Sequence, residues 1–104
     1  MEKRKPTCDL EGFREEFCSV GALRMTRTAQ TTAWALGLSL ADVVLVVQSM
    51  KREHFYKSMT SFADHRIWQD VYHVPSAVGV LYVKFTADAL KEFLLLSFKE
   101  KDDE

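Results

Sequence analysis

The 104 residues are enough for one domain with a single modest core, and a composition of 47% hydrophobic and 12% aromatic residues excludes a disordered chain. The net charge is −1, so no overall positive field draws the protein to nucleic acid. Four carboxylates lie among the last five positions, and the chain without them carries +3. We expect one domain over residues 1–104 with a short acidic tail at about 102–104, and any RNA binding requires a local basic patch.

The N-terminal third predicts two short helices with a strand between them. Asp9 is a suitable N-cap for a first helix whose apolar residues recur at helical spacing, and Gly21 can end it. Residues 23–27 alternate between apolar and polar side chains, as a short strand does. Thr28 can then cap a second helix over residues 29–36. No apolar run follows the charged N-terminus, so we expect no secretory signal.

The valine-rich run at residues 43–47 is compatible with two structures. Its β-branched content favours a buried strand, whereas the spacing of its apolar residues fits one face of a helix. Ser39 and Asp42 form a capping box just before it, and because this start signal is present we favour the helix. The apolar stretch 34–47 is too short and too often interrupted by polar residues to cross a bilayer.

The second half predicts four antiparallel strands, because the apolar period changes there from 3.6 to 2 residues. Turn-like residues separate the strands at Asp64, at Pro75–Ser76 and at 88–92. The fold class is therefore α+β, with N-terminal helices packed on one face of a mostly antiparallel sheet. The predicted strands are 54–62, 66–73, 79–87 and 93–99.

Strand alternation divides the side chains of this sheet between a core face and an outer face. In the first strand Phe55, Lys57 and Met59 share one side, and Lys57 directed outward would join the outer face. The core face is expected to hold Trp68, Tyr72, Leu81, Val83, Phe85, Leu94, Leu96 and Phe98. The outer face is expected to hold Gln69, Val71, His73, Tyr82, Lys84, Leu95, Ser97 and Lys99, with no carboxylate that alternation places there.

A face of lysines with a tyrosine and a glutamine suits a phosphodiester and could cleave RNA without a metal ion. The ribose 2′-hydroxyl attacks phosphorus, so a base, an acid and a cation for the developing charge are needed. Clustered lysines would lower one another's pKa values and favour tyrosinate. For any single residue the structural explanation is the commoner one, since lysine on an exposed sheet face usually prevents aggregation. Their convergence on one face is what indicates function.

Other catalytic or metal-binding patterns are weak. Cys8 and Cys18 form no metal-ligand pattern, and free thiols fit a reducing cytoplasm. Three histidines lie in the second half, of which His73 shares the side of Gln69, while a structural role in a turn is at least as plausible for His65. We therefore expect no bound metal and no cofactor in this chain.

Several stretches carry a resemblance to a known family. They are 55–60, 64–65, 67–72, 80–84 and 97–101, and the similarity extends over nearly the whole chain. The sequence resembles the motility quorum-sensing regulator toxins, the MqsR family of mRNA interferases. The resemblance implies the fold of the RelE-like ribonuclease toxins. It also implies a toxin of a type II toxin–antitoxin module that inhibits translation and growth.

The family likeness also implies an activity and a site. The activity would be an endoribonuclease, independent of metal and ribosome, that cuts messenger RNA at GC-starting triplets such as GCU. The catalytic set of the family, a lysine, a glutamine, a tyrosine and a second lysine, matches Lys57, Gln69, Tyr82 and Lys99. As further RNA-binding residues we expect Lys84, His73 and Arg66.

The partner implied by the resemblance is an MqsA-like antitoxin with a zinc-binding half and a DNA-binding half. The zinc would belong to that partner, and operator DNA would be reached only through it. No membrane partner is expected. An alternative stays open: a non-catalytic or weakly catalytic, antitoxin-paired regulatory binding protein on the same fold, for which the nearly neutral net charge speaks.

Overall fold

The computed structural model describes residues 1–88 and 92–103 and contains one five-stranded sheet. The strands follow one another in chain order, and every neighbouring pair is antiparallel. They are β1 (Glu2–Lys3), β2 (Phe55–Thr60), β3 (Trp68–Ser76), β4 (Gly79–Ala87) and β5 (Phe93–Glu100). The predicted α+β class is confirmed, whereas β1 was not predicted. Part of the predicted turn at 88–92 lies outside the described residues.

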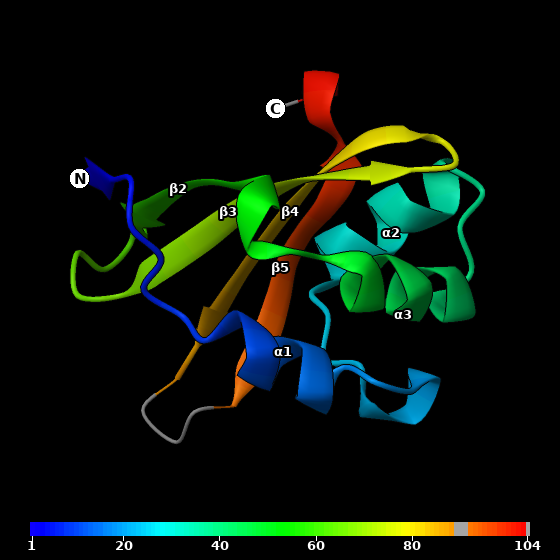
Figure 1. Cartoon of the computed structure of the whole chain (residues 1–104), viewed down its shortest axis with the longest axis horizontal. Coiled ribbons are helices and arrows are strands. Elements are labelled where there is room, and N and C mark those ends of the chain that lie inside the picture. Colours follow the sequence, from blue (N-terminus) through cyan, green and yellow to red (C-terminus); the bar gives the residue numbers. More distant parts are fainter. Residues whose placement is uncertain (89–91, 104) are drawn as a thin grey trace.

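Three helices lie on one side of the sheet, α1 beside one end of β4 and β5 and α2 with α3 toward the other end (Figure 1). No single helix of the described chain is long and apolar enough to span a bilayer; α2 and α3 reach that composition only as a pair, bent by 97°. The helices are α1 (Leu10–Glu16), α2 (Arg27–Ala35) and α3 (Leu40–Ser49), with 3-10 turns η1 (Val20–Ala22), η2 (Arg52–His54) and η3 (Lys101–Asp103).

The local start signals explain where the helices begin. Asp9 caps α1 by accepting a hydrogen bond from the Glu11 amide. Both halves of the capping box between Ser39 and Asp42 are present, so the valine run is helical as predicted. The cap of α2 is Thr26 and not Thr28, because the Thr26 hydroxyl is the one that accepts from the helix.

The end of α1 was predicted wrongly, and a tertiary contact explains why. The helix stops five residues before Gly21, where the buried Phe17 leaves the helix to enter the core. The Gln48 amide on α3 donates to the carbonyls of Arg14 and Phe17, at 2.7 and 3.0 Å. A side chain 31 or more positions away thus satisfies carbonyls at the end of α1, which a glycine C-cap would otherwise help to satisfy.

The strand predicted at 23–27 is also not formed as expected. Only one parallel bridge, between Met25 and Leu95 of β5, is present there.

The core lies between the helices and the inner face of the sheet. The Phe13 ring of α1 stacks on Phe85 of β4, with ring centroids 3.9 Å apart. Three valines of α3, at positions 43, 46 and 47, are buried in the same cluster. This packing fixes which face of the sheet the helices cover, and so leaves the opposite face open for a site.

Two β-bulges change the predicted faces. In β2 the register shifts between Phe55 and Lys57, so Phe55 packs against the core while Lys57 pairs with Val71 on the outer face. The prediction that Phe55 and Lys57 share a side is therefore wrong.

A second shift breaks the alternation in β5, where Ser97 opposes Lys84 but Leu95 opposes Phe85. Leu95 is consequently fully buried, and Leu94 and Leu96 are only partly so, the reverse of the prediction. Phe98, Ser97 and Lys99 lie on the faces that alternation predicted.

Candidate functional site

The helix-free face of the sheet gathers polar residues in three consecutive cross-strand rows, which we call the lysine face. Residues directly opposite each other in an antiparallel pair project to the same side. The first row is His73, Tyr82 and Lys99; the second is Lys57, Val71, Lys84 and Ser97; the third contains Met59 and Gln69. Six of the seven residues predicted for catalysis or RNA binding therefore share one face.

Aromatic and cationic groups are in close contact at the first row. The Lys99 ammonium lies 5.1 Å from the centre of the Tyr82 ring, and the centres of the His73 and Tyr82 rings are 6.1 Å apart. The Tyr56 ring stacks on His73 at 4.2 Å. The Lys57 ammonium is 5.4 Å from the Tyr56 ring, so the first and second rows form one connected patch.

The charges of the lysine face act on Lys84. Burial lowers the pKa of its ammonium, and the nearby positive charges of Lys99 and Lys57 lower that pKa further. The expected lowering of lysine pKa values by clustering is thus found for Lys84. Two ammonium groups close enough to repel that of Lys84 make this part of the face suited to an anion.

For Lys57 the expectation is wrong, because a carboxylate is present. The Lys57 ammonium donates to a carboxylate oxygen of Glu2 at 3.0 Å, and this hydrogen bond raises its pKa. Glu2 comes from β1, which pairs with the edge of β2. Sequence reasoning missed Glu2 since no local pattern predicts the pairing of a two-residue strand with a partner more than 50 positions away.

Gln69 and Arg66 differ in how they relate to this site. Gln69 lies in the third row, opposite Met59, one row beyond Lys57 on the same face. Arg66 lies in the loop before β3 and forms an ion pair with Asp64 at 3.1 Å. The structure therefore brings Gln69 to the lysine face and leaves Arg66 outside it.

A buried carboxylate directly behind the lysine face holds the N-terminal segment in place. Asp70 is fully buried and accepts hydrogen bonds from the Thr7 and Cys8 amides, the shortest at 2.8 Å, and from the Ser58 hydroxyl at 2.6 Å. Asp70 and Ser58 are paired neighbours on β3 and β2. The segment so anchored leads back to β1, whose pairing with β2 places Glu2 beside Lys57.

The remaining nucleophilic and metal-binding side chains do not join this site. His54 accepts a hydrogen bond from the Lys51 amide and so completes a local turn. His65 lies in the exposed loop before β3. Among residues 1–88 and 92–103 no group of three His, Cys, Asp or Glu side chains is placed to hold a metal ion.

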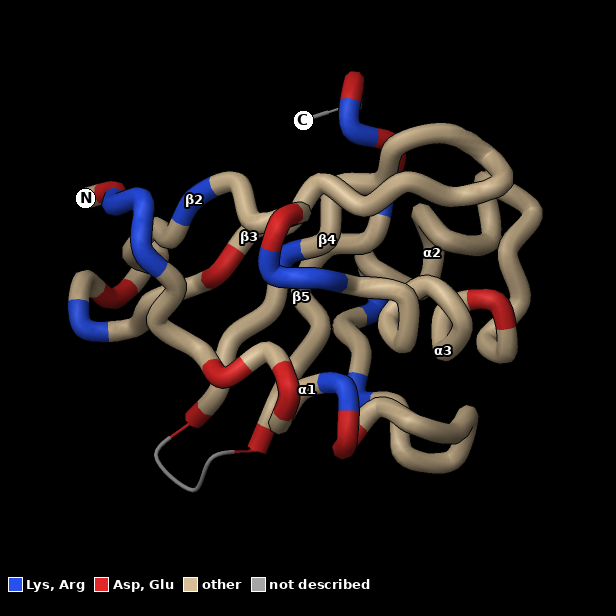
Figure 2. Tube along the Cα trace, viewed as in Figure 1, with Lys and Arg blue, Asp and Glu red and all other residues tan. Residues whose placement is uncertain are grey.

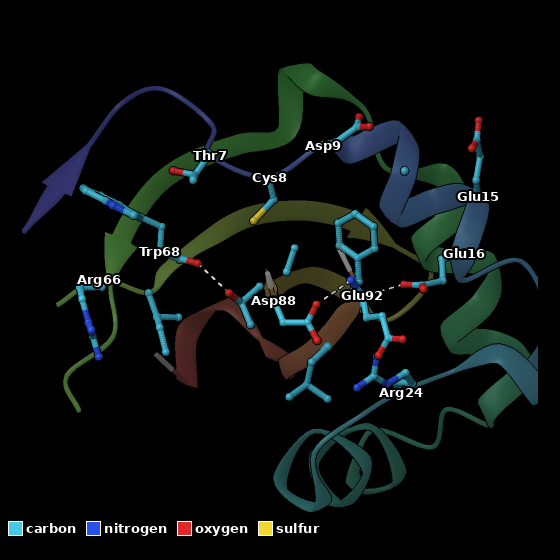
Figure 3. Close-up of a pocket in the computed structure, with 16 residues that line it drawn as sticks. Thr7, Cys8, Asp9, Glu15, Glu16, Arg24, Arg66, Trp68, Asp88 and Glu92 are labelled. Carbon is cyan, nitrogen blue, oxygen red and sulfur yellow. Dashed lines mark hydrogen bonds and ion pairs between the residues drawn. The ribbon is translucent and has the colours of Figure 1, made fainter. Parts of the chain in front are cut away.

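A sizeable hollow lies elsewhere in the described chain and has the wrong charge for RNA. It measures about 1130 Å³ and opens between α1 and the ends of β4 and β5. Figure 3 shows Glu92 paired with Arg24 on one side of the hollow, while Arg66 and Trp68 line the opposite side. Its acidic lining residues are Asp9, Glu15, Glu16, Asp88 and Glu92.

The distribution of charge over the chain agrees with this assignment. Figure 2 shows acidic residues around α1 and the adjoining ends of β4 and β5, while basic residues occur along the N-terminal segment and the strands. A polyanion would be repelled from the acidic hollow and attracted to the lysine face. The lysine face, and not the acidic hollow, is therefore the candidate site.

Comparison with known proteins gives two matches over almost the full length. A family model described as "Motility quorum-sensing regulator, toxin of MqsA" matches residues 5–100. The mRNA interferase toxin MqsR of Escherichia coli (strain K12) is 40% identical over 101 residues, which are 97% of this chain and 100% of that protein. Both agree with the resemblance that the sequence itself carries.

Proposed function

The chain belongs to the motility quorum-sensing regulator toxin family, and from this premise we propose that it is an mRNA-cleaving endoribonuclease whose active site is the lysine face. One observation carries the assignment of the site: Lys57, Lys84 and Lys99 converge beside Tyr82 on the one face that the helices leave open. An antitoxin partner and an RNA substrate follow from the family. Messenger RNA as substrate implies action in the cytoplasm.

The proposed reaction is an internal transesterification. The ribose 2′-oxygen attacks the adjacent phosphorus, the bond from phosphorus to the 5′-oxygen breaks, and the products carry a 2′,3′-cyclic phosphate and a 5′-hydroxyl. One proton leaves the 2′-hydroxyl for a base, and one reaches the departing oxygen from an acid. Preorganised ammonium groups stabilise the charge that develops on the phosphoryl oxygens.

Residue roles follow from position on the lysine face. Lys57 and Lys99 would hold the scissile phosphate from two sides, with Lys84 between them. Tyr82, in contact with Lys99, would act in proton transfer. Gln69, one row away, would orient the 2′-hydroxyl or read a base edge. His73 contacts the rings of both Tyr56 and Tyr82 and would contact the RNA there.

The finer activity is cleavage at GC-starting triplets such as GCU, without metal or ribosome. Purified protein should cut a GCU-containing RNA equally well with and without chelator, leaving a 2′,3′-cyclic phosphate. A 2′-deoxy substitution at the scissile nucleotide should abolish the cut. Lys57→Ala should abolish cleavage with the fold intact, whereas Lys51→Ala, an equal change on the helix side, should not. Wild-type cleavage by a folded Lys57→Ala protein would refute the site.

Two observations favour the non-catalytic alternative. Glu2 occupies the Lys57 ammonium, and the net charge of the chain is −1. RNA binding without cleavage in the same gel would support that alternative. In either case two or three lysine–phosphate contacts to single-stranded RNA imply a slope of log affinity against log salt of about −1.4 to −2.1.

The proposed partner is an MqsA-like antitoxin, in which zinc would reside in the partner. The supporting observation is the family description, which names the toxin together with MqsA. Co-expressed with such an antitoxin, the chain should elute as a complex that no longer cleaves RNA. Binding to operator DNA should then require the antitoxin and be absent for this chain alone.

A further inference from the structure

The bulge in β2 places one aromatic residue, Tyr56, on the lysine face without an opposing residue. The register passes from the pair of Phe55 with Tyr72 directly to the pair of Lys57 with Val71. Tyr56 is the extra residue, and its ring lies against His73 at 4.2 Å with an angle of 22° between the ring planes. A bulge redirects a side chain in this way without ending the strand.

Tyr56 differs from Tyr82 in how much of its surface solvent reaches. Tyr82 is only 7% exposed, and its ring lies close to the Lys99 ammonium and the His73 ring. Tyr56 is 36% exposed while its ring is supported from one side by His73. A nucleobase needs an accessible ring face to stack on, so Tyr56 can serve as a platform where Tyr82 cannot.

Cations surround the Tyr56 ring. The Arg4 guanidinium lies 5.5 Å from the ring centre and the Lys57 ammonium 5.4 Å from it. Arg4 also donates to the Tyr56 carbonyl at 3.2 Å, which fixes the N-terminal segment beside the ring. A partly exposed aromatic ring with cations close to it is an arrangement by which proteins bind single-stranded nucleic acid, with the base on the ring and the phosphates on the cations.

We propose that Tyr56, backed by His73, is the stacking platform for a nucleobase next to the scissile phosphate. This inference rests on the proposed ribonuclease function and deepens it. Stacking at Tyr56 places the neighbouring phosphate within reach of Lys57, so the platform sets the register of the RNA on the lysine face. Every base has a stacking face, so Tyr56 supplies position and affinity, and the choice of bases falls to polar groups such as Gln69.

The test measures the coupling between the Tyr56 ring and individual bases. Binding is measured with a GCU-containing RNA that has a 2′-deoxy scissile nucleotide, so that it cannot be cut. A series of the same RNA carries an abasic ribose at each position in turn. Wild type, Tyr56→Ala and Tyr56→Phe are compared, with Trp34→Ala on α2, an exposed aromatic of the helix layer, as the matched control.

Tyr56→Ala should weaken binding of the intact RNA by about 5- to 150-fold, the usual range for the loss of one stacked base. Tyr56→Phe and Trp34→Ala should bind like wild type. Removing the base at one position of the RNA should weaken binding by wild type by a similar factor. The same abasic RNA should bind Tyr56→Ala almost as well as the intact RNA does, because the stacking contact is already absent.

Additive losses at every position would overturn the platform. So would unchanged binding by Tyr56→Ala, or a loss that Tyr56→Phe shares. These results leave the proposed function standing if wild type still cuts the unmodified RNA. A wild-type protein that neither binds nor cuts RNA refutes the proposed function itself, and the platform with it.

Discussion

The Glu2 carboxylate accepts a hydrogen bond from the Lys57 ammonium at 3.0 Å, across 55 positions of sequence. It occupies the ammonium that is proposed to hold the scissile phosphate. The lysine is mostly shielded, with 18% of its side chain exposed, whereas 56% of the Glu2 side chain is exposed. A phosphodiester must therefore displace a carboxylate whose side chain is more than half exposed to solvent.

Glu2→Gln should strengthen RNA binding. Removing the carboxylate removes both a competitor for Lys57 and a negative charge beside the path of the RNA. The expected gain is about three- to tenfold in affinity at low salt, on the scale of one screened charge pair near a surface. Fluorescence anisotropy with an RNA that cannot be cut measures it.

Glu11→Gln is the matched control, since it removes the same charge from an ion pair on α1. Its affinity for RNA should stay close to that of wild type. The Lys57 pKa, followed by NMR of its side chain, should fall in Glu2→Gln because the hydrogen bond that raises it is gone. Weaker RNA binding by Glu2→Gln would mean that Glu2 positions Lys57 and does not compete with the substrate.

Lys84→Met should stabilise the protein and impair RNA binding. Burial and two neighbouring lysines lower the Lys84 pKa, so the folded state holds this proton less tightly than the unfolded state does. The charged form therefore costs stability at neutral pH, and the cost disappears as the pH rises past the unfolded value near ~10.4. Urea unfolding at pH 7 should show a gain of up to about 1 kcal/mol that narrows toward alkaline pH.

The same substitution would remove one proposed phosphate contact. The slope of log affinity against log salt should become shallower by about 0.7. Lys51→Met, at the exposed residue before η2, should change neither the free energy of unfolding nor the slope of log affinity against log salt. If Lys84→Met instead destabilises the fold at pH 7, packing of the lysine stem outweighs the repulsion between the ammonium groups.

Strand period predicted the lysine-face residues of β3 and β4 correctly, because alternation is unbroken there. His73, Tyr82 and Lys84 lie where a period of 2 places them. Alternation failed in β2 and β5, because each contains a bulge, and a bulge depends on how two strands fit together.

Long-range partners explain the other differences. Gln48 ends α1 from a position on α3, and Glu2 reaches Lys57 through a strand of only two residues. Neither contact leaves a periodic pattern near its own position in the sequence. The capping box of α3, by contrast, is complete within four residues, and its prediction is confirmed.

Asp70→Asn should destabilise the fold far more than a surface substitution. An asparagine of the same size removes the charge and keeps one acceptor oxygen, so the hydrogen bonds from the Thr7 and Cys8 amides weaken and the Ser58 hydroxyl can no longer donate to a carboxylate. The expected loss is about 2–4 kcal/mol by chemical denaturation. Ser58→Ala, which removes one of these hydrogen bonds and leaves the carboxylate in place, should cost only about 1 kcal/mol. Equal losses in the two variants would show that Asp70 is not the anchor of the N-terminal segment.

The two free cysteines should react at very different rates. Burial raises the Cys8 pKa to about 12, with the Asp70 carboxylate as the second cause, while Cys18 is exposed. Because the thiolate is the reactive form, iodoacetamide at pH 8 should modify Cys18 faster than Cys8 by on the order of 100-fold or more. Mass spectrometry of the digested protein measures both rates in one sample.

The raised pKa of Cys8 also predicts how stability depends on pH. A thiol that ionises more readily when unfolded favours unfolding once the pH exceeds its unfolded value near ~8.5, and the effect grows until the pH reaches the folded value. Tyr72, whose pKa burial raises to about 12, acts in the same direction from about pH 10. Thermal unfolding should therefore show that stability decreases from about pH 9 upward. In Cys8→Ser the decrease should begin at a higher pH, because the contribution of the thiol is absent. A flat profile between pH 8 and 10 in wild type, or equal labelling of the two cysteines, would show that the Cys8 thiol reaches solvent.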